Sequence, residues 1–132
     1  MSELSERLAA LSGADRECDL ACWRILNPTK ILNRLAVYRL DEMPEDEFDL
    51  YLYEESPVYT YDLNPVIAEI ERRGWNWAVD HGPGAQPSGL VHSKHHDFDW
   101  IYAPTPCLAL LRALIAAVEA ERAATTQREM RA

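Results

Sequence analysis

Side chains that could bind a metal ion gather in one short stretch of the sequence. Its candidate ligands are His92, His95, His96 and Asp97. Neutral imidazole and carboxylate groups suit zinc and other transition metals, and His92, His95 and Asp97 would be the set used by a small metal-dependent hydrolase. No second ligand pair such as Cys-x-x-Cys is present to complete a tetrahedral site. If 90–93 and 98–102 pair as strands, the stretch is an ordinary hairpin turn, and we favour this interpretation, with no bound metal or cofactor.

Carboxylate side chains are concentrated in a second stretch, residues 41–55. The eight acidic residues there are Asp41, Glu42, Glu45, Asp46, Glu47, Asp49, Glu54 and Glu55, and no Lys or Arg lies among them. They fit a solvated loop, as most charge runs do, or a magnesium site for phosphoryl chemistry. A third interpretation is an interaction surface, whose spaced carboxylates imitate the phosphates of a nucleic acid and bind the basic groove of another protein. Aromatic residues interleaved with the charges favour this third interpretation, because aromatic anchors are common at interfaces.

The remaining motifs do not indicate catalysis. Gly82 and Gly84 belong to no phosphate-binding motif, and the sequence has neither a Gly-x-Ser-x-Gly elbow nor a zincin motif. Trp75, Trp77 and Trp100 could stack on a base or a sugar, but at strand spacing they more commonly fill the core between a sheet and its helices. We therefore predict a protein that is not an enzyme and has no catalytic residues.

Length and composition indicate one folded domain over residues 1–132. Hydrophobic residues make up 48% of the chain and charged residues 27%, which excludes collagen-like, disordered and disulfide-scaffold classes. The formal net charge of −9 argues against direct binding of nucleic acid, because phosphates require clustered cations. The same charge favours a partner protein with a basic surface.

The first residues and the cysteines predict a cytoplasmic protein without membrane contact. Residues 1–7 are acidic and helical in pattern, unlike a secretory signal. The most apolar stretch, Cys107–Val118, contains Arg112 and is too short to cross a bilayer. Three cysteines do not make a secreted disulfide framework. Cys18 and Cys22 are four residues apart and are expected to be buried on one helix face.

Capping residues and apolar spacing predict four helices. The caps are Ser2, Asp15, Asn64 and Thr105, and the stops lie at 12–13, 27–28, Gly74 and, by a change to polar sequence, Glu121. The helix over Thr105–Ala120 should be central, because it has the widest apolar stripe: Cys107, Leu110, Leu111, Leu114, Ile115 and Val118. We expect residues 121–132 to fray.

Alternating patterns predict short strands in the second half of the chain. These strands cover 75–80, 90–93 and 98–102, and the first and last have an aromatic face made of Trp75, Trp77, Phe98, Trp100 and Tyr102. The sequence does not decide the secondary structure of residues 29–57, since both paired strands at 35–40 and 49–53 and a helix from Thr29 would suit them. The predicted fold class is α+β, a small, mostly antiparallel sheet of about three to five strands packed with about four helices.

Four motifs occur in the order found in a family of small tailed-phage and prophage proteins. They are Arg7-Leu8 with Leu11–Trp23, Tyr59-Thr60 with Asp62-Leu63, Gly74–Val79, and Ala103–Ala113. The chain thus resembles the phage ABA-sandwich domains, in which a small sheet lies between helices and to which no catalytic residues are assigned. The likeness covers about 1–26 and 58–120, whereas 29–57 and the His92–Asp97 stretch depart from it. The resemblance implies a phage or prophage origin, the cytoplasm of a bacterial host and an accessory role.

The function predicted from these features is that of a phage-encoded, non-enzymatic accessory protein that binds another protein. Within this class we favour an inhibitor of a bacterial defence complex, such as a CRISPR effector, acting through the acidic residues of 41–55. One alternative is a small metal-dependent hydrolase built on the His92–Asp97 stretch. The other is a virion or self-assembling component in which 29–57 contributes to a homo-oligomer.

Overall fold

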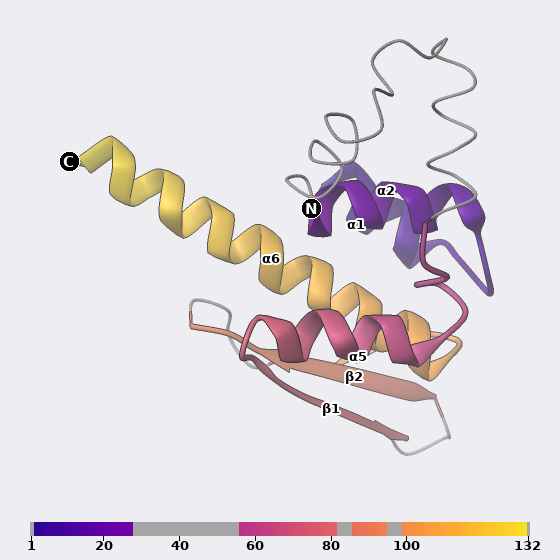
Figure 1. The fold of residues 1–132 in the computed structure, drawn as a ribbon. Coiled ribbons are helices and arrows are strands. Elements are labelled where there is room, and N and C mark those ends of the chain that lie inside the picture. Colours follow the sequence, from indigo (N-terminus) through magenta and orange to yellow (C-terminus); the bar gives the residue numbers. More distant parts are fainter. Residues whose placement is uncertain (1, 28–55, 82–85, 95–98, 132) are drawn as a thin grey trace, which may run out of the picture.

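The structure, a computed structural model, describes residues 2–27, 56–81, 86–94 and 99–131 (Figure 1). Its elements are the helices α1 (Glu3–Ala9), α2 (Arg16–Leu26), α5 (Leu63–Arg72) and α6 (Pro106–Arg131) and the strands β1 (Asn76–His81), β2 (Pro87–His92) and β3 (Ile101–Tyr102). Four helices with a small antiparallel sheet confirm the predicted α+β class. The choice between helix and strands after Thr29 lies outside the described residues.

The sheet has the order β1-β2-β3, and both pairings are antiparallel. Val79 lies opposite Gly89, which pairs on its other side with Ile101. The main-chain N–H of Ala103 donates to the carbonyl of Pro87 at 3.1 Å and extends the second pairing. β3 therefore pairs with the first half of β2 and not with the second half, so the connection between these strands is longer than the hairpin turn that the sequence suggested.

α6 lies directly on the sheet because Gly89 has no side chain. A Cβ atom at Gly89 would lie 2.6 Å from the main-chain nitrogen of Leu110. α5 covers the same face, since Trp77 points to the Gly89 side of the sheet and its indole N–H donates to Glu71 at 3.4 Å. α1 and α2 lie on the far side of α6 (Figure 1). No described element covers the opposite face of the sheet, so the helix–sheet–helix order implied by the resemblance is not seen in these parts of the chain.

α6 is central to the core, as the sequence predicts. All six residues of its apolar stripe are buried: Cys107, Leu110, Leu111, Leu114, Ile115 and Val118. α6 contacts α1, α2, α5 and each of the three strands. Trp75 and Trp77 pack against this core, which confirms their predicted role. Within the described ranges, no helix has the length and hydropathy needed to cross a membrane.

Three of the four predicted helix caps are confirmed. The side chains of Ser2, Asp15 and Thr105 accept hydrogen bonds from the main-chain N–H three residues later, at 3.0 to 3.1 Å. The fourth is wrong by two residues, because Asp62 and not Asn64 caps α5, accepting from the N–H of Asn64 at 3.0 Å. Gly74 follows the end of α5 with φ +75°, a left-handed conformation that glycine adopts without strain.

α6 continues as a helix to Arg131, through the stretch in which the sequence predicts fraying. Two contacts hold it where that stretch begins. Ser93 donates to Glu121 at 2.9 Å, and Arg122 donates to the carbonyl of Ile25. The last turns of α6 then project from the rest of the described fold (Figure 1).

The prediction that Trp100, on the aromatic face of the last strand, fills the core is wrong. Ile101 packs against the core, whereas Trp100 and Tyr102 are 43% and 47% exposed. The reason is the pairing of Ile101 with Gly89, which places the Ile101 side chain on the face that α6 covers and directs the next residue to the other face. Phe98, assigned to the same aromatic face, lies outside the described residues.

The three cysteines are buried and unbridged, as predicted for Cys18 and Cys22. Burial raises the pKa of each thiol, and that of Cys107 to about 12. The thiols therefore stay protonated at neutral pH and pack as small apolar groups without the reactivity of a thiolate.

Candidate functional site

The acidic residues predicted to bind a partner all lie outside the described residues. Asp41, Glu42, Glu45, Asp46, Glu47, Asp49, Glu54 and Glu55 belong to 28–55. The structure describes the two positions between which this segment runs, Asn27 at the end of α2 and Ser56 ahead of α5. Each position is held by a cluster of polar side chains.

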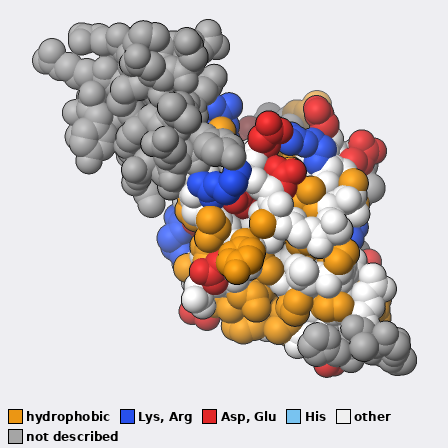
Figure 2. All heavy atoms as spheres, turned by 90° about the vertical axis from the view of Figure 1, so that its right-hand side faces the viewer, with side chains coloured by type: hydrophobic (Ala, Val, Ile, Leu, Met, Phe, Trp, Pro, Cys, Tyr) orange, Lys and Arg blue, Asp and Glu red, His pale blue; other side chains and the backbone are white. Residues whose placement is uncertain are grey.

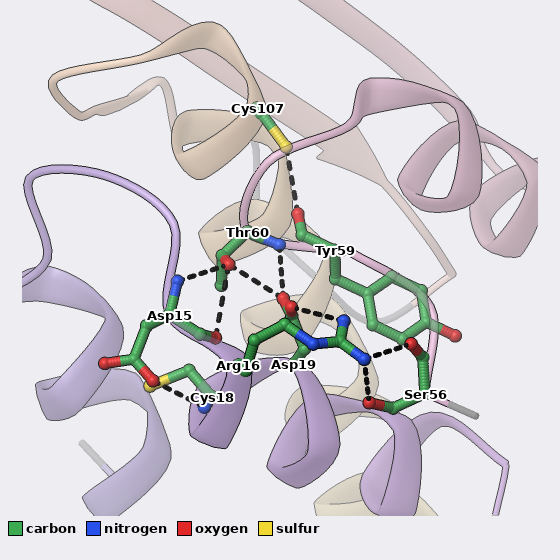
Figure 3. A network of polar contacts seen from close by, with 8 residues as sticks. All are labelled: Asp15, Arg16, Cys18, Asp19, Ser56, Tyr59, Thr60 and Cys107. Carbon is green, nitrogen blue, oxygen red and sulfur yellow. Dashed lines mark hydrogen bonds and ion pairs between the residues drawn. The ribbon is translucent and has the colours of Figure 1, made fainter. Parts of the chain in front are cut away.

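The first cluster surrounds the carboxylate of Asp19, which is 1% exposed (Figure 3). Its Oδ1 accepts hydrogen bonds from the main-chain N–H and the hydroxyl of Thr60, both at 2.7 Å. Its Oδ2 pairs with the guanidinium of Arg16 at 2.9 Å. A second nitrogen of that guanidinium donates to the carbonyl and the hydroxyl of Ser56 at 2.9 and 3.1 Å. Arg16 thus ties Ser56 to the first turn of α2.

Contacts of Thr60 and of its neighbour Tyr59 join the turn before α5 to the start of α2 and to the first turn of α6 (Figure 3). The main-chain N–H of Asp15 donates to the Thr60 hydroxyl at 2.8 Å, while the Asp15 carboxylate caps α2. The thiol of Cys107, in the first turn of α6, donates to the carbonyl of Tyr59 at 2.9 Å. The chain between Ser56 and α5 is therefore fixed to both α2 and α6.

The second cluster surrounds Glu69 of α5, whose side chain is 13% exposed. One carboxylate oxygen accepts hydrogen bonds from the Asn27 amide at 3.0 Å and the Tyr59 hydroxyl at 3.2 Å. The other oxygen pairs with both Arg72 and Arg73. A single carboxylate thus links α5 to the end of α2 and to the turn that contains Tyr59.

Arginines from two other parts of the fold satisfy the carbonyl end of α2. Arg73 donates to the carbonyl of Leu26 at 2.6 Å, and Arg122 of α6 donates to the carbonyl of Ile25. The last carbonyl groups of a helix have no partner within it, and the helix dipole favours cations there. Asn27 is therefore held at a helix end that hydrogen bonds and charge both stabilise.

Both ionisable groups at the centre of the second cluster have shifted pKa values. Burial opposes ionisation of Glu69, but hydrogen bonds from Arg72, Asn27 and Arg73 outweigh burial and lower the pKa of this carboxyl. Burial, and then the neighbouring Glu69 carboxylate, raise the pKa of Tyr59. At neutral pH the Glu69 carboxylate is therefore charged, and the Tyr59 phenol stays protonated and donates to it. The pair stabilises the fold and is not set up to exchange a proton.

Glu69→Gln is expected to lower the free energy of unfolding at pH 7 by about 2 kcal/mol, because two arginines lose a charged acceptor. The lowered pKa means that the Glu69 carboxylate stabilises the fold at pH values above its ordinary pKa of 4.5, and that this contribution is lost as pH falls through the folded-state value. The difference between Glu69→Gln and the unchanged protein should therefore shrink in urea titrations at about pH 3. Glu71→Gln, at the exposed neighbouring carboxylate, is the control and should change stability by less than about 0.5 kcal/mol. If the two proteins differed in free energy of unfolding by the same amount at both pH values, the lowered pKa of Glu69 would be contradicted.

The structure places one of the four candidate metal ligands. His92 lies exposed at the end of β2, and His95, His96 and Asp97 lie outside the described residues. Across 2–27, 56–81, 86–94 and 99–131, no group of three or more His, Cys, Asp or Glu side chains is placed to hold a metal ion. The described ranges therefore add no ligand to the stretch that the sequence singled out.

A groove of about 400 Å³ runs along α6 between α1 and β3. It is lined by Ser5, Ile101, Arg112, Ala116, Glu119 and Ala120. Its charged groups make contacts within the fold: Arg112 donates to the carbonyl of Tyr102 at 2.8 Å, and Glu119 accepts from Ser2 at 2.5 Å. The lining contains no histidine, cysteine or lysine, and we assign no reaction to it.

Sequence analysis missed both polar clusters. Arg16 lies three residues from Asp19, and Glu69 lies three residues from Arg72, a spacing at which opposite charges meet on a helix surface. That signal was present in the sequence. Arg73, four residues after Glu69, has the same local signal. The partners Thr60 and Asn27 lie 41 and 42 residues from the carboxylates that they contact and have no local signal.

Comparison with known proteins found no relative: no protein-family model, no curated protein and no solved structure matches this chain.

Proposed function

We propose that this chain is a phage-encoded, non-enzymatic accessory protein that acts by binding another protein, with residues 41–55 as the contact. The observation that carries the proposal is the distribution of charge. Eight of the 22 acidic residues lie in 41–55 without any Lys or Arg, and the rest of the chain has 14 acidic residues against 13 Lys and Arg. Nearly all of the net charge of −9 therefore belongs to this one segment.

Ion pairs in the described part of the chain support this division of charge. They are Arg7–Glu17, Arg16–Asp19, Arg72–Glu69 and Arg73–Glu69. On the face shown in Figure 2, acidic and basic side chains lie intermixed beside a region of hydrophobic side chains. A surface of mixed charge attracts a basic partner weakly, whereas a dense negative segment speeds association and makes it sensitive to salt.

The two polar clusters support a binding role for the segment between them. Asn27 and Ser56 are hydrogen-bonded to Glu69 and Arg16, each of which belongs to a buried or half-buried ion pair, so the described chain is fixed at both positions. Fixed ends reduce the conformational entropy that a segment loses when it binds.

The partner class that we propose is a bacterial defence complex with a basic nucleic-acid groove, such as a CRISPR effector, in the cytoplasm of the host. Spaced carboxylates suit a groove that binds phosphates. The resemblance to tailed-phage proteins supports a phage origin, and the net charge of −9 opposes direct binding of nucleic acid by this chain.

A pull-down from bacterial lysate at low and high salt tests the proposal. We expect a basic protein to be retained at low salt and released at high salt. Reversing the charges of Glu45, Asp46 and Glu47 to lysine should weaken binding of that protein about tenfold or more.

The matched control reverses three exposed carboxylates in the described helices, Glu6, Glu17 and Glu129. It changes the net charge equally and should leave most of the affinity in place. Binding that survives the change at 45–47, or that falls equally in the control, would show that the acidic segment is not the contact.

A further inference from the structure

One long edge of the sheet is open in the described part of the chain. β1 has six residues and pairs with β2 alone, whereas β3, at the other edge, has two residues. α5 and α6 also pack against β1, but both cover a face of the sheet and not this edge (Figure 1).

The register identifies which main-chain groups point out from this edge. The carbonyl of Pro87 accepts from Ala103, so the main-chain groups of Pro87 point toward β3. Main-chain groups alternate in direction along a strand, so Ser88 and Leu90 point toward β1. Their partners in β1 are Asp80 and Ala78, which therefore bond to β2. The N–H and carbonyl groups of the alternate residues Trp77, Val79 and His81 point away from the sheet.

This edge has few of the features with which proteins protect exposed strands. β1 contains no proline and no lysine, and its six consecutive pairs with β2 leave no room for a bulge. Val79, whose main chain points out from the edge, also has a side chain that is 37% exposed. Trp77 and Val79 place apolar side chains on the helix-covered face, directly beside unpaired main-chain groups.

We propose that β1 pairs antiparallel with β1 of a second copy of this chain, so that one sheet continues across a two-fold axis. With Val79 of the two copies opposite each other, Trp77 of each lies opposite His81 of the other, and every outward main-chain group gains a partner. The two exposed valines meet at the axis, and Asp80 lies opposite Ala78, so that no like charges are directly opposed. A strand edge that complements itself in this way is what a two-fold interface requires.

Concentration-dependent hydrogen exchange of the full chain tests the pairing directly. We expect the amides of Trp77 and Val79 to exchange at least about tenfold more slowly at high protein concentration, while the amide of Ala78, already bonded to β2, does not change. Light scattering should report a mass near twice the 15.1 kDa of one chain under the same conditions. A single-chain mass with fast exchange at Trp77 and Val79 would overturn the proposal. Protection that arises only after another protein is added would do so too, because the edge would then bind a foreign strand.

Two variants at the axis provide a second test. Val79→Cys should form a disulfide-linked dimer on mild oxidation, because paired residues of antiparallel strands lie about 5.5 Å apart, within the range of a disulfide. The native cysteines are buried and do not compete. Tyr61→Cys, at a residue that is 76% exposed and away from β1, is the control: it should keep the non-covalent dimer but form no disulfide-linked dimer. Equal cross-linking of the two variants, or none in Val79→Cys, would contradict the pairing.

Val79→Lys places like charges opposite each other and should give a folded monomer, with Tyr61→Lys as the matched control that keeps the dimer. The exchange experiment on the unchanged protein decides the question if Val79→Lys does not fold. Pairing through β1 does not depend on the function proposed for 41–55, and each proposal fails or holds separately.

Discussion

Asp19→Ala is expected to lower the free energy of unfolding by about 3 to 4 kcal/mol, because it removes one partner from a buried ion pair. The carboxylate is 1% exposed, and its loss removes the charged partner of Arg16 and leaves the main-chain N–H of Thr60 without its acceptor. Buried donors that lose an acceptor cost more than the hydrogen bond contributed when it was made. The loss should also weaken the hold of Arg16 on Ser56, next to the acidic segment.

Urea titration measures the effect, and Glu17→Ala is the matched control. Glu17 is in the same helix, but its side chain is 82% exposed and lies 3.8 Å from Arg7. Its removal should change stability by no more than about 0.5 kcal/mol. Thr60→Val keeps the main-chain hydrogen bond to Asp19, and its loss of stability should lie between those of Asp19→Ala and Glu17→Ala. Similar losses in Asp19→Ala and Glu17→Ala would show that the buried cluster does not stabilise the fold.

Gly89→Ala is expected to lower the free energy of unfolding by about 3 kcal/mol through overpacking. The added Cβ would lie 2.6 Å from the nitrogen of Leu110 and 2.7 to 2.8 Å from main-chain atoms of Ala109. These are backbone atoms of α6, so no side chain can move aside, and the helix itself must shift from the sheet. Because α6 contacts every other described element, the strain should spread through the core.

Two other glycines provide graded controls for this prediction. Gly74→Ala forces a side chain into φ +75° and should cost about 1 kcal/mol, although nothing lies within 4 Å of the new Cβ. Gly13→Ala meets no atom within 4 Å and should be neutral or slightly stabilising. Urea midpoints of the three variants should follow this order. A Gly89→Ala protein as stable as Gly13→Ala would show that α6 and β2 are not in close contact.

The helices were predictable because their signals are local. Caps at Ser2, Asp15 and Thr105 act within three residues, and the apolar stripe of α6 repeats within two turns. The start of α5 was misplaced because Asp62 and Asn64 are both capping residue types two positions apart. Local patterns cannot separate two such neighbours.

The candidate site was predictable only in part. The acidic composition of 41–55 and its contribution to the net charge follow from the residue types. The carboxylates that hold the described chain at Asn27 and Ser56 were not singled out, since Asp19 and Glu69 differ from other acidic residues only in their distant partners.

Residue order alone determined that α6 would be buried along one face, that three cysteines would stay unbridged and that negative charge would be concentrated in a single segment. Tertiary structure alone decided that Ile101 and not Trp100 would face the core, that Gly89 would receive the backbone of α6 and that no second described strand would pair with β1. The physical reason is range: capping, periodicity and charge are properties of neighbouring residues, whereas strand register and close packing are set by contacts between residues far apart in the chain.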